Sequence, residues 1–146
     1  MSNESKTVDA TPESQPESLE ELVKRAEFAT MPDMTRPQDL TVSQSAMLAV
    51  TETRYRGRMK QLEQLGAFTN LEQFEDTAES TLLVAESVEY LDALFRSFAV
   101  NESEWETWTK GRSVFTLFTL YSVLFTFYLR TLGKSDASKL PSQKIE

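Results

Sequence analysis

The chain contains no cysteine and no histidine. The absence of cysteine excludes disulfides and zinc–thiolate sites, and the absence of histidine excludes imidazole catalysis. With only four glycines and five prolines in 146 residues, long helices are favoured over a sandwich of short strands. No phosphate loop, nucleophile elbow or dinucleotide fingerprint occurs. We therefore expect a protein that is not an enzyme, with no catalytic residue, no cofactor and no metal site.

The chain also has few basic residues, and its formal net charge is −8 with a pI of about 4.7. Nucleic-acid binding needs a basic surface, so no nucleic-acid partner is expected. The first residues are acidic and contain no apolar core, so they do not predict a secretory signal. The length is sufficient for one domain with a modest core.

Two long helices are predicted in the middle of the chain. Thr41 and Gln44 form a capping-box pattern that opens a helix over residues 42–65, with Gly66 as its stop. Thr69 and Glu72 repeat that pattern before a second helix, over residues 70–98. The apolar positions are Leu48, Tyr55, Met59 and Leu62 in the first helix, and Leu71, Phe74, Ala78, Leu82, Ala85, Val88, Leu91, Phe95 and Phe98 in the second. The short link between them predicts an antiparallel hairpin.

Shorter elements flank this hairpin. A helix over residues 17–29, opened by Pro16 or Ser18, is followed by an extended connector over residues 30–41. A short helix begins at Asn101 or Ser103, with Glu104 or Glu106 three residues later, and Gly111 is a possible break before the next element. The fold class is therefore all-α, with a disordered acidic tail over 1–16, a single helical domain over 17–132 and a disordered polar tail over 133–146.

Residues 114–129 form the largest apolar stretch, without a charge, glycine or proline. As a helix the stretch would span about 24 Å, short of the roughly 30 Å hydrocarbon core of a bilayer. Arg112 and Arg130 bracket it and could lie at the two interfaces, so a membrane anchor over residues 113–130 is one interpretation. The hydroxyl residues instead recur at helical spacing, which favours a buried or partner-docked helix with one weakly polar stripe: Ser113, Thr116, Thr119, Ser122 and Thr126.

Two charged clusters are candidate sites. The acids Glu72, Glu75, Asp76 and Glu79 could hold a cation, or be a solvated face near a helix N-terminus. The bases Arg54, Arg56, Arg58 and Lys60 could contact phosphate, or be an ion-paired helix face. The hairpin would bring the two clusters near each other, and solvation or ion pairing is the simpler interpretation of both.

Aromatic residues near the end of the chain are the candidate partner-binding residues. Trp and Tyr are enriched at protein interfaces and at membrane interfaces, and they are also ordinary core residues. The candidates are Trp105, Trp108, Phe115, Phe118, Tyr121, Phe125 and Tyr128.

The segment Glu104–Ser135, EWETWTKGRSVFTLFTLYSVLFTFYLRTLGKS, resembles the C-terminal end of tail assembly chaperones from long-tailed bacteriophages of the siphovirus type. Those proteins are small, acidic and mostly helical, and they end in an aromatic-rich helix followed by a Gly–Lys or Gly–Glu step. In that family the step marks a programmed ribosomal frameshift, which here would lie at Leu132–Lys134.

The resemblance implies a non-enzymatic chaperone in the host cytoplasm. Its partner would be the tape-measure protein or further copies of itself, as a homo-oligomer. The alternatives are a small membrane-anchored helical protein and a structural subunit of a virion or another assembly.

Overall fold

The computed structural model describes residue 16, residues 18–66 and residues 78–139, with the backbone alone for residues 133–139. The all-α prediction is confirmed, because the described residues form helices and contain no strand beyond one isolated bridge. In chain order the elements are α2 (Leu19–Leu22), the 3₁₀ turns η1 (Ala26–Phe28) and η2 (Pro37–Asp39), α3 (Val42–Gln64), α5 (Ala78–Phe98), α6 (Glu102–Thr109) and α7 (Val114–Lys139).

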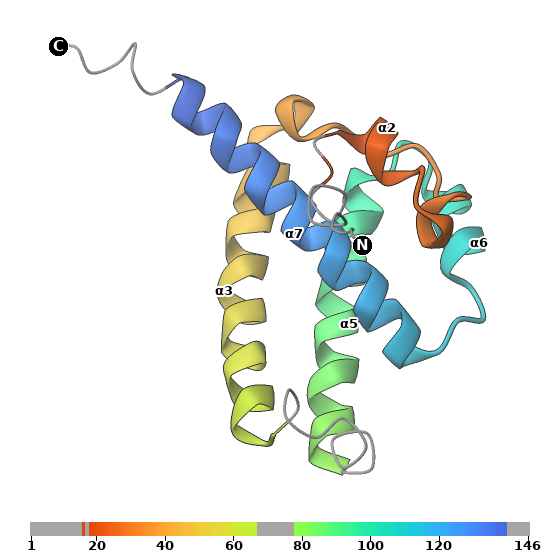
Figure 1. Cartoon of the computed structure of the whole chain (residues 1–146), viewed down its shortest axis with the longest axis vertical. Coiled ribbons are helices and arrows are strands. Elements are labelled where there is room, and N and C mark those ends of the chain that lie inside the picture. Colours follow the sequence, from red (N-terminus) through yellow and green to blue (C-terminus); the bar gives the residue numbers. More distant parts are fainter. Residues whose placement is uncertain (1–15, 17, 67–77, 140–146) are drawn as a thin grey trace, which may run out of the picture.

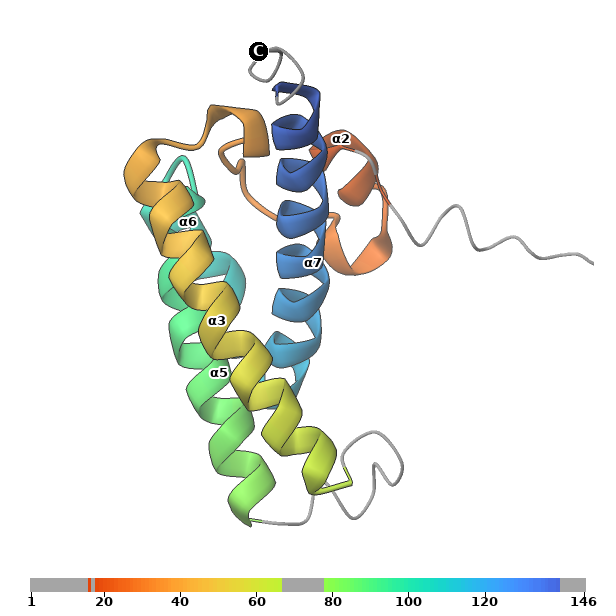
Figure 2. The ribbon, with the colours of Figure 1, turned by 90° about the vertical axis from the view of Figure 1, so that its left-hand side faces the viewer.

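Helices α3 and α5 lie side by side as the predicted antiparallel hairpin (Figure 1). Helix α7 crosses the hairpin obliquely, and in Figure 2 the α2 segment lies on the far side of α7 from the hairpin. Helix α5 packs against α3, α6 and α7, so it is the central element of the bundle.

The predicted caps of α3 are confirmed. The Thr41 hydroxyl accepts from the Gln44 amide at 3.1 Å, and the Gln44 side chain accepts from the Thr41 amide at 2.9 Å. At the other end Gly66 has a φ of 86°, the left-handed conformation that glycine adopts after a helix. The predicted inward positions of α3 are all buried or half-buried.

The inward face of α5 differs from the prediction at two positions, because Ala78 and Leu82 are both exposed. Leu82 was expected inside but is 61% exposed, whereas its neighbours Leu83 and Val84 are buried. Three adjacent apolar residues occur here, and a helix can turn only some of them inward. Residues 69–77, where this helix was predicted to be capped and to begin, lie outside the described residues. They include Thr69, Leu71 and Phe74.

The connector before α3 is fastened to the end of α5. The Thr35 amide donates to the Phe98 carbonyl at 2.7 Å, and the Val100 amide donates to the Asp33 carbonyl at 3.0 Å. These bonds flank the isolated antiparallel bridge between Met34 and Ala99. The chain therefore enters and leaves the hairpin at one point.

The helix predicted over residues 17–29 is wrong in extent. Ser18 caps α2 as expected, but that helix ends at Leu22, and Arg25 is extended before the η1 turn. Leu22 and Phe28, six positions apart, would point roughly 120° apart on a continuous helix at 3.6 residues per turn. The break allows both side chains to be fully buried in the same core.

Gly111 separates α6 from α7, with a φ of 80°. Asn101 caps α6 by accepting from the Glu104 amide at 3.0 Å, as predicted. Helix α7 continues beyond Leu132 to Lys139, although we expected it to end before Gly133. A single glycine costs a helix only about 1 kcal/mol relative to alanine, so Gly133 does not stop it, whereas Pro141 lies beyond its end.

Candidate partner-binding site

The seven candidate partner-binding residues are divided by the fold. Five of them are buried in the core of the bundle: Trp105, Trp108, Tyr121, Phe125 and Tyr128. Phe115 and Phe118 are only partly buried on α7. The buried five serve the core, although Trp108 also lines a groove described below, and Phe115 and Phe118 are partly accessible to another molecule.

Phe95 of α5 is the centre of the aromatic core. Its ring centroid lies 5.7 to 6.4 Å from the centroids of five other rings, those of Phe98, Trp105, Tyr121, Phe125 and Tyr128. Tyr55 of α3 joins the same cluster through Phe125, at 4.9 Å. The cluster thus connects all four of the longer described helices.

Asp92 provides a polar centre beside these rings. Its Oδ1 accepts hydrogen bonds from Trp105 Nε1 at 2.9 Å and from the Tyr121 hydroxyl at 2.6 Å. Its Oδ2 accepts from Arg96 at 3.0 Å, and Arg96 is also paired with Glu102 and Glu106 of α6. The sequence analysis did not single out Asp92, whose two aromatic partners lie 13 and 29 positions along the chain.

The two buried tyrosines of α7 are neutral donors. Burial raises the pKa of Tyr121 above its usual range, and the nearby Asp92 carboxylate raises it further. Burial likewise raises the pKa of Tyr128, which donates to the Thr35 carbonyl in the connector. Each phenol therefore fastens α7 to another segment through a hydrogen bond.

The hydroxyl stripe of α7 faces outward. Ser113, Thr116, Thr119 and Thr126 are exposed on the side opposite the buried rings, whereas Ser122 is only partly exposed and its hydroxyl oxygen is buried. Within the described part of the chain, Val114–Leu132 is the one helical segment long and apolar enough to cross a membrane, and 33% of it is buried. The core helix of a soluble protein meets the same criteria of length and composition.

Two of the four bases are ion-paired, whereas Arg54 and Lys60 are exposed, and most of the acidic cluster lies outside the described residues. Arg56 pairs with Glu52 one turn away, and Arg58 pairs with Glu86 of α5 at 3.0 Å. The hairpin therefore does bring a base and an acid together, although the acid is Glu86. Of the acidic cluster only Glu79 is described, and it is exposed, whereas Glu72, Glu75 and Asp76 lie outside the described residues.

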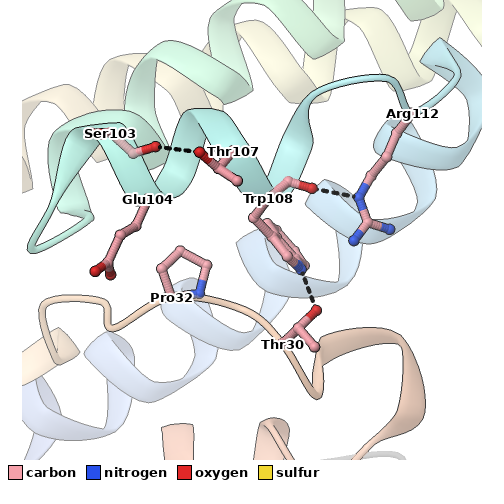
Figure 3. A pocket seen from close by; sticks show the side chains of 7 residues that line it. All are labelled: Thr30, Pro32, Ser103, Glu104, Thr107, Trp108 and Arg112. Atoms are coloured by element: carbon pink, nitrogen blue, oxygen red, sulfur yellow. Dashed lines mark hydrogen bonds between the residues drawn. The ribbon is translucent and has the colours of Figure 1, made fainter.

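An open groove of about 530 Å³ lies between α6 and the segment that precedes η2 (Figure 3). Its lining residues are Thr30, Pro32, Ser103, Glu104, Thr107, Trp108 and Arg112. The Arg112 guanidinium lies 4.7 Å from the centroid of the Trp108 ring, and its Nε donates to the Trp108 carbonyl at 2.8 Å. Trp108 Nε1 donates to the Thr30 hydroxyl at 3.1 Å.

Among the described side chains, no group of three or more carboxylates is placed to hold a metal ion. Comparisons of the chain with protein-family models, with curated proteins and with solved structures each found no match.

Proposed function

We propose that this protein is a non-enzymatic tail assembly chaperone that binds the tape-measure protein in the host cytoplasm, as a homo-oligomer. The supporting observation is the outward face of α7, the helix that carries the resemblance. On that face the partly exposed Phe115, Phe118 and Leu129 alternate with the exposed Thr119 and Thr126. A face of this kind suits a long helical client, because aromatic rings supply contact area and hydroxyls keep the free surface soluble.

The partner test compares a partly exposed position on α7 with an exposed position on α3. Phe118→Glu on α7 should abolish co-purification with a co-expressed tape-measure protein, because a charge would be buried in the contact. Val50→Glu is the control, since Val50 is 53% exposed on α3. If both variants bind the tape-measure protein equally well, the outward face of α7 is not part of the contact.

The gene provides a second test. Leu132, Gly133 and Lys134 can be encoded by CTG GGA AAA, which contains the heptamer G GGA AAA. Both decoding tRNAs can re-pair on that heptamer after a one-base backward slip. The proposal requires this heptamer, an overlapping −1 frame that runs well past Glu146, and a very long helical tape-measure gene downstream. Non-slippery codons with a −1 frame that closes at once would contradict the frameshift.

Membrane anchoring is a second candidate, favoured by the length and composition of Val114–Leu132. In that state α7 would have to leave the bundle, and Asp92 and the Thr35 carbonyl would lose their tyrosine donors.

A permanent virion subunit is a third candidate. The protein should be found in purified particles if it is a subunit, and absent from them if it is a chaperone.

A further inference from the structure

The groove between α6 and the segment before η2 contains the guanidinium of Arg112, which is held in one orientation but has donor groups left to bind a ligand. Arg112 Nε is held by the Trp108 carbonyl, and the charged group lies over the Trp108 ring. Among the described residues its two terminal nitrogens have no hydrogen-bond partner and no carboxylate within ion-pair distance. By contrast, Arg36, Arg58 and Arg96 all pair with carboxylates.

A second donor faces the same groove. The Thr30 hydroxyl oxygen accepts from Trp108 Nε1, so the hydroxyl hydrogen is still available to donate. In Figure 3 the Arg112 guanidinium lies beside the Trp108 ring, and Thr30 lies at the Nε1 edge of that ring. Together they provide a fork of N–H donors and one O–H donor beside an apolar floor made by Trp108 and Pro32.

We propose that this groove binds the carboxylate of an acidic side chain presented by a partner peptide. A planar carboxylate matches the fork of Arg112, and the methylene groups of a glutamate would lie against Trp108 and Pro32. A phosphate dianion fits less well, because its two negative charges would meet a single base, Arg112, and the acid Glu104 is also in the lining. The volume of about 530 Å³ is within the usual range for small-ligand sites.

This inference is independent of the tail chaperone proposal, because it concerns a different face of the molecule and a test without the tape-measure protein. The two tryptophans of the chain supply the readout, since each contributes one indole N–H resonance. A carboxylate bound to the Thr30 hydroxyl would polarise the Trp108 N–H through that hydroxyl. The Trp105 N–H, bonded to Asp92, is the internal reference.

The experiment titrates the full chain with acetyl-glutamate amide and follows both indole resonances by NMR. We expect a saturable shift of the Trp108 resonance, with a dissociation constant in the millimolar range, and little shift for Trp105. Acetyl-glutamine amide should give no such shift. An unchanged Trp108 resonance with the glutamate probe, or tighter binding of inorganic phosphate, would overturn the assignment.

Substitutions locate the site. Arg112→Gln should weaken binding roughly ten- to a hundred-fold, which corresponds to one charge-assisted pair of hydrogen bonds. Arg112→Lys keeps the charge but loses the fork, and should also weaken binding. Arg54→Gln, at an exposed arginine of α3, is the matched control and should bind normally. Glu104→Gln should tighten binding a few-fold, because it removes an acid from the lining. An unchanged affinity in both Arg112 variants would overturn the proposal.

Discussion

The indole of Trp105 is stacked on the phenol of Tyr121, with 5.7 Å between the ring centroids and 22° between the planes. Both side chains donate to the same atom, Asp92 Oδ1. Trp105 belongs to α6, Tyr121 to α7 and Asp92 to α5, so one carboxylate fixes three helices relative to one another.

Removal of that carboxylate should be costly. Asp92→Ala leaves two largely buried donors unpaired and breaks the Arg96 ion pair, at about 2–5 kcal/mol of unfolding free energy in total. Glu89→Ala, at an exposed position of the same helix, should cost less than about 0.5 kcal/mol. Urea denaturation followed by circular dichroism measures both. A cost below about 1 kcal/mol for Asp92→Ala would mean that the network contributes little.

The buried tyrosines predict alkaline unfolding. The pKa values of Tyr121 and Tyr128 are raised above 10.0, so both remain neutral in the folded chain where an unfolded chain would ionise. Their contribution to stability is complete below about pH 10 and is lost as the pH rises further. We expect the free energy of unfolding to fall above pH 10 by up to about 2.7 kcal/mol per pH unit for the two groups together.

Denaturant titrations between pH 8 and pH 12 would measure this slope. The variant Tyr128→Phe should show about half of it, since one of the two groups is gone. A slope that is the same in the variant and the parent chain would assign the pH dependence to other groups.

Gly57 offers a stabilising substitution. It lies within the continuous helix α3, and a Cβ placed there meets no atom within 4 Å. Gly57→Ala should raise the free energy of unfolding by about 0.4–1 kcal/mol. Gly111→Ala is the opposite case, because its φ of 80° strains any other residue, and it should be destabilising. Thermal melts of the two variants should therefore move in opposite directions.

The hydroxyl stripe separates a bundle helix from a membrane anchor. Thr119 and Thr126 are exposed on α7, so the double variant Thr119→Lys, Thr126→Lys should fold and fractionate as the parent chain does. In a membrane span each lysine would cost about 2.5–3.5 kcal/mol near the helix centre. If the parent chain sediments with membranes and the double variant is released from them, the anchor interpretation holds. Fractionation without detergent, followed by immunoblotting, is the measurement.

Local signals predicted three of the helix ends, but not the end of α2 at Leu22 or that of α7 at Lys139. Thr41 with Gln44, Asn101 with Glu104, and Gly66 each act within a few positions of the chain, so their spacing alone identifies them. The inward face of α5 was harder, because Leu82, Leu83 and Val84 are adjacent and equally apolar. Packing against α3 and α7 decides which of them is buried, and that packing is not a local property.

The side-chain contacts that tie the fold together were not predictable in this way. Asp92 lies between Leu91 and Ala93, where a single acid in a helix usually faces solvent, and its partners are 13 and 29 positions away. Trp108 and Thr30 are 78 positions apart. Composition identified the aromatic residues but not their division between the core and the surface, which depends on how α7 crosses the hairpin.

The position of α7 in the chain has a consequence for synthesis. The hairpin and the bridge that closes it are complete once Val100 has been translated, whereas three of the rings around Phe95 belong to α7. Until those residues leave the ribosome, a nascent hairpin presents Phe95 and Phe98 to solvent, and such an apolar surface promotes association. Slow synonymous codons between Val114 and Tyr128 would lengthen that interval, and would increase the aggregated fraction of a protein whose amino-acid sequence is unchanged.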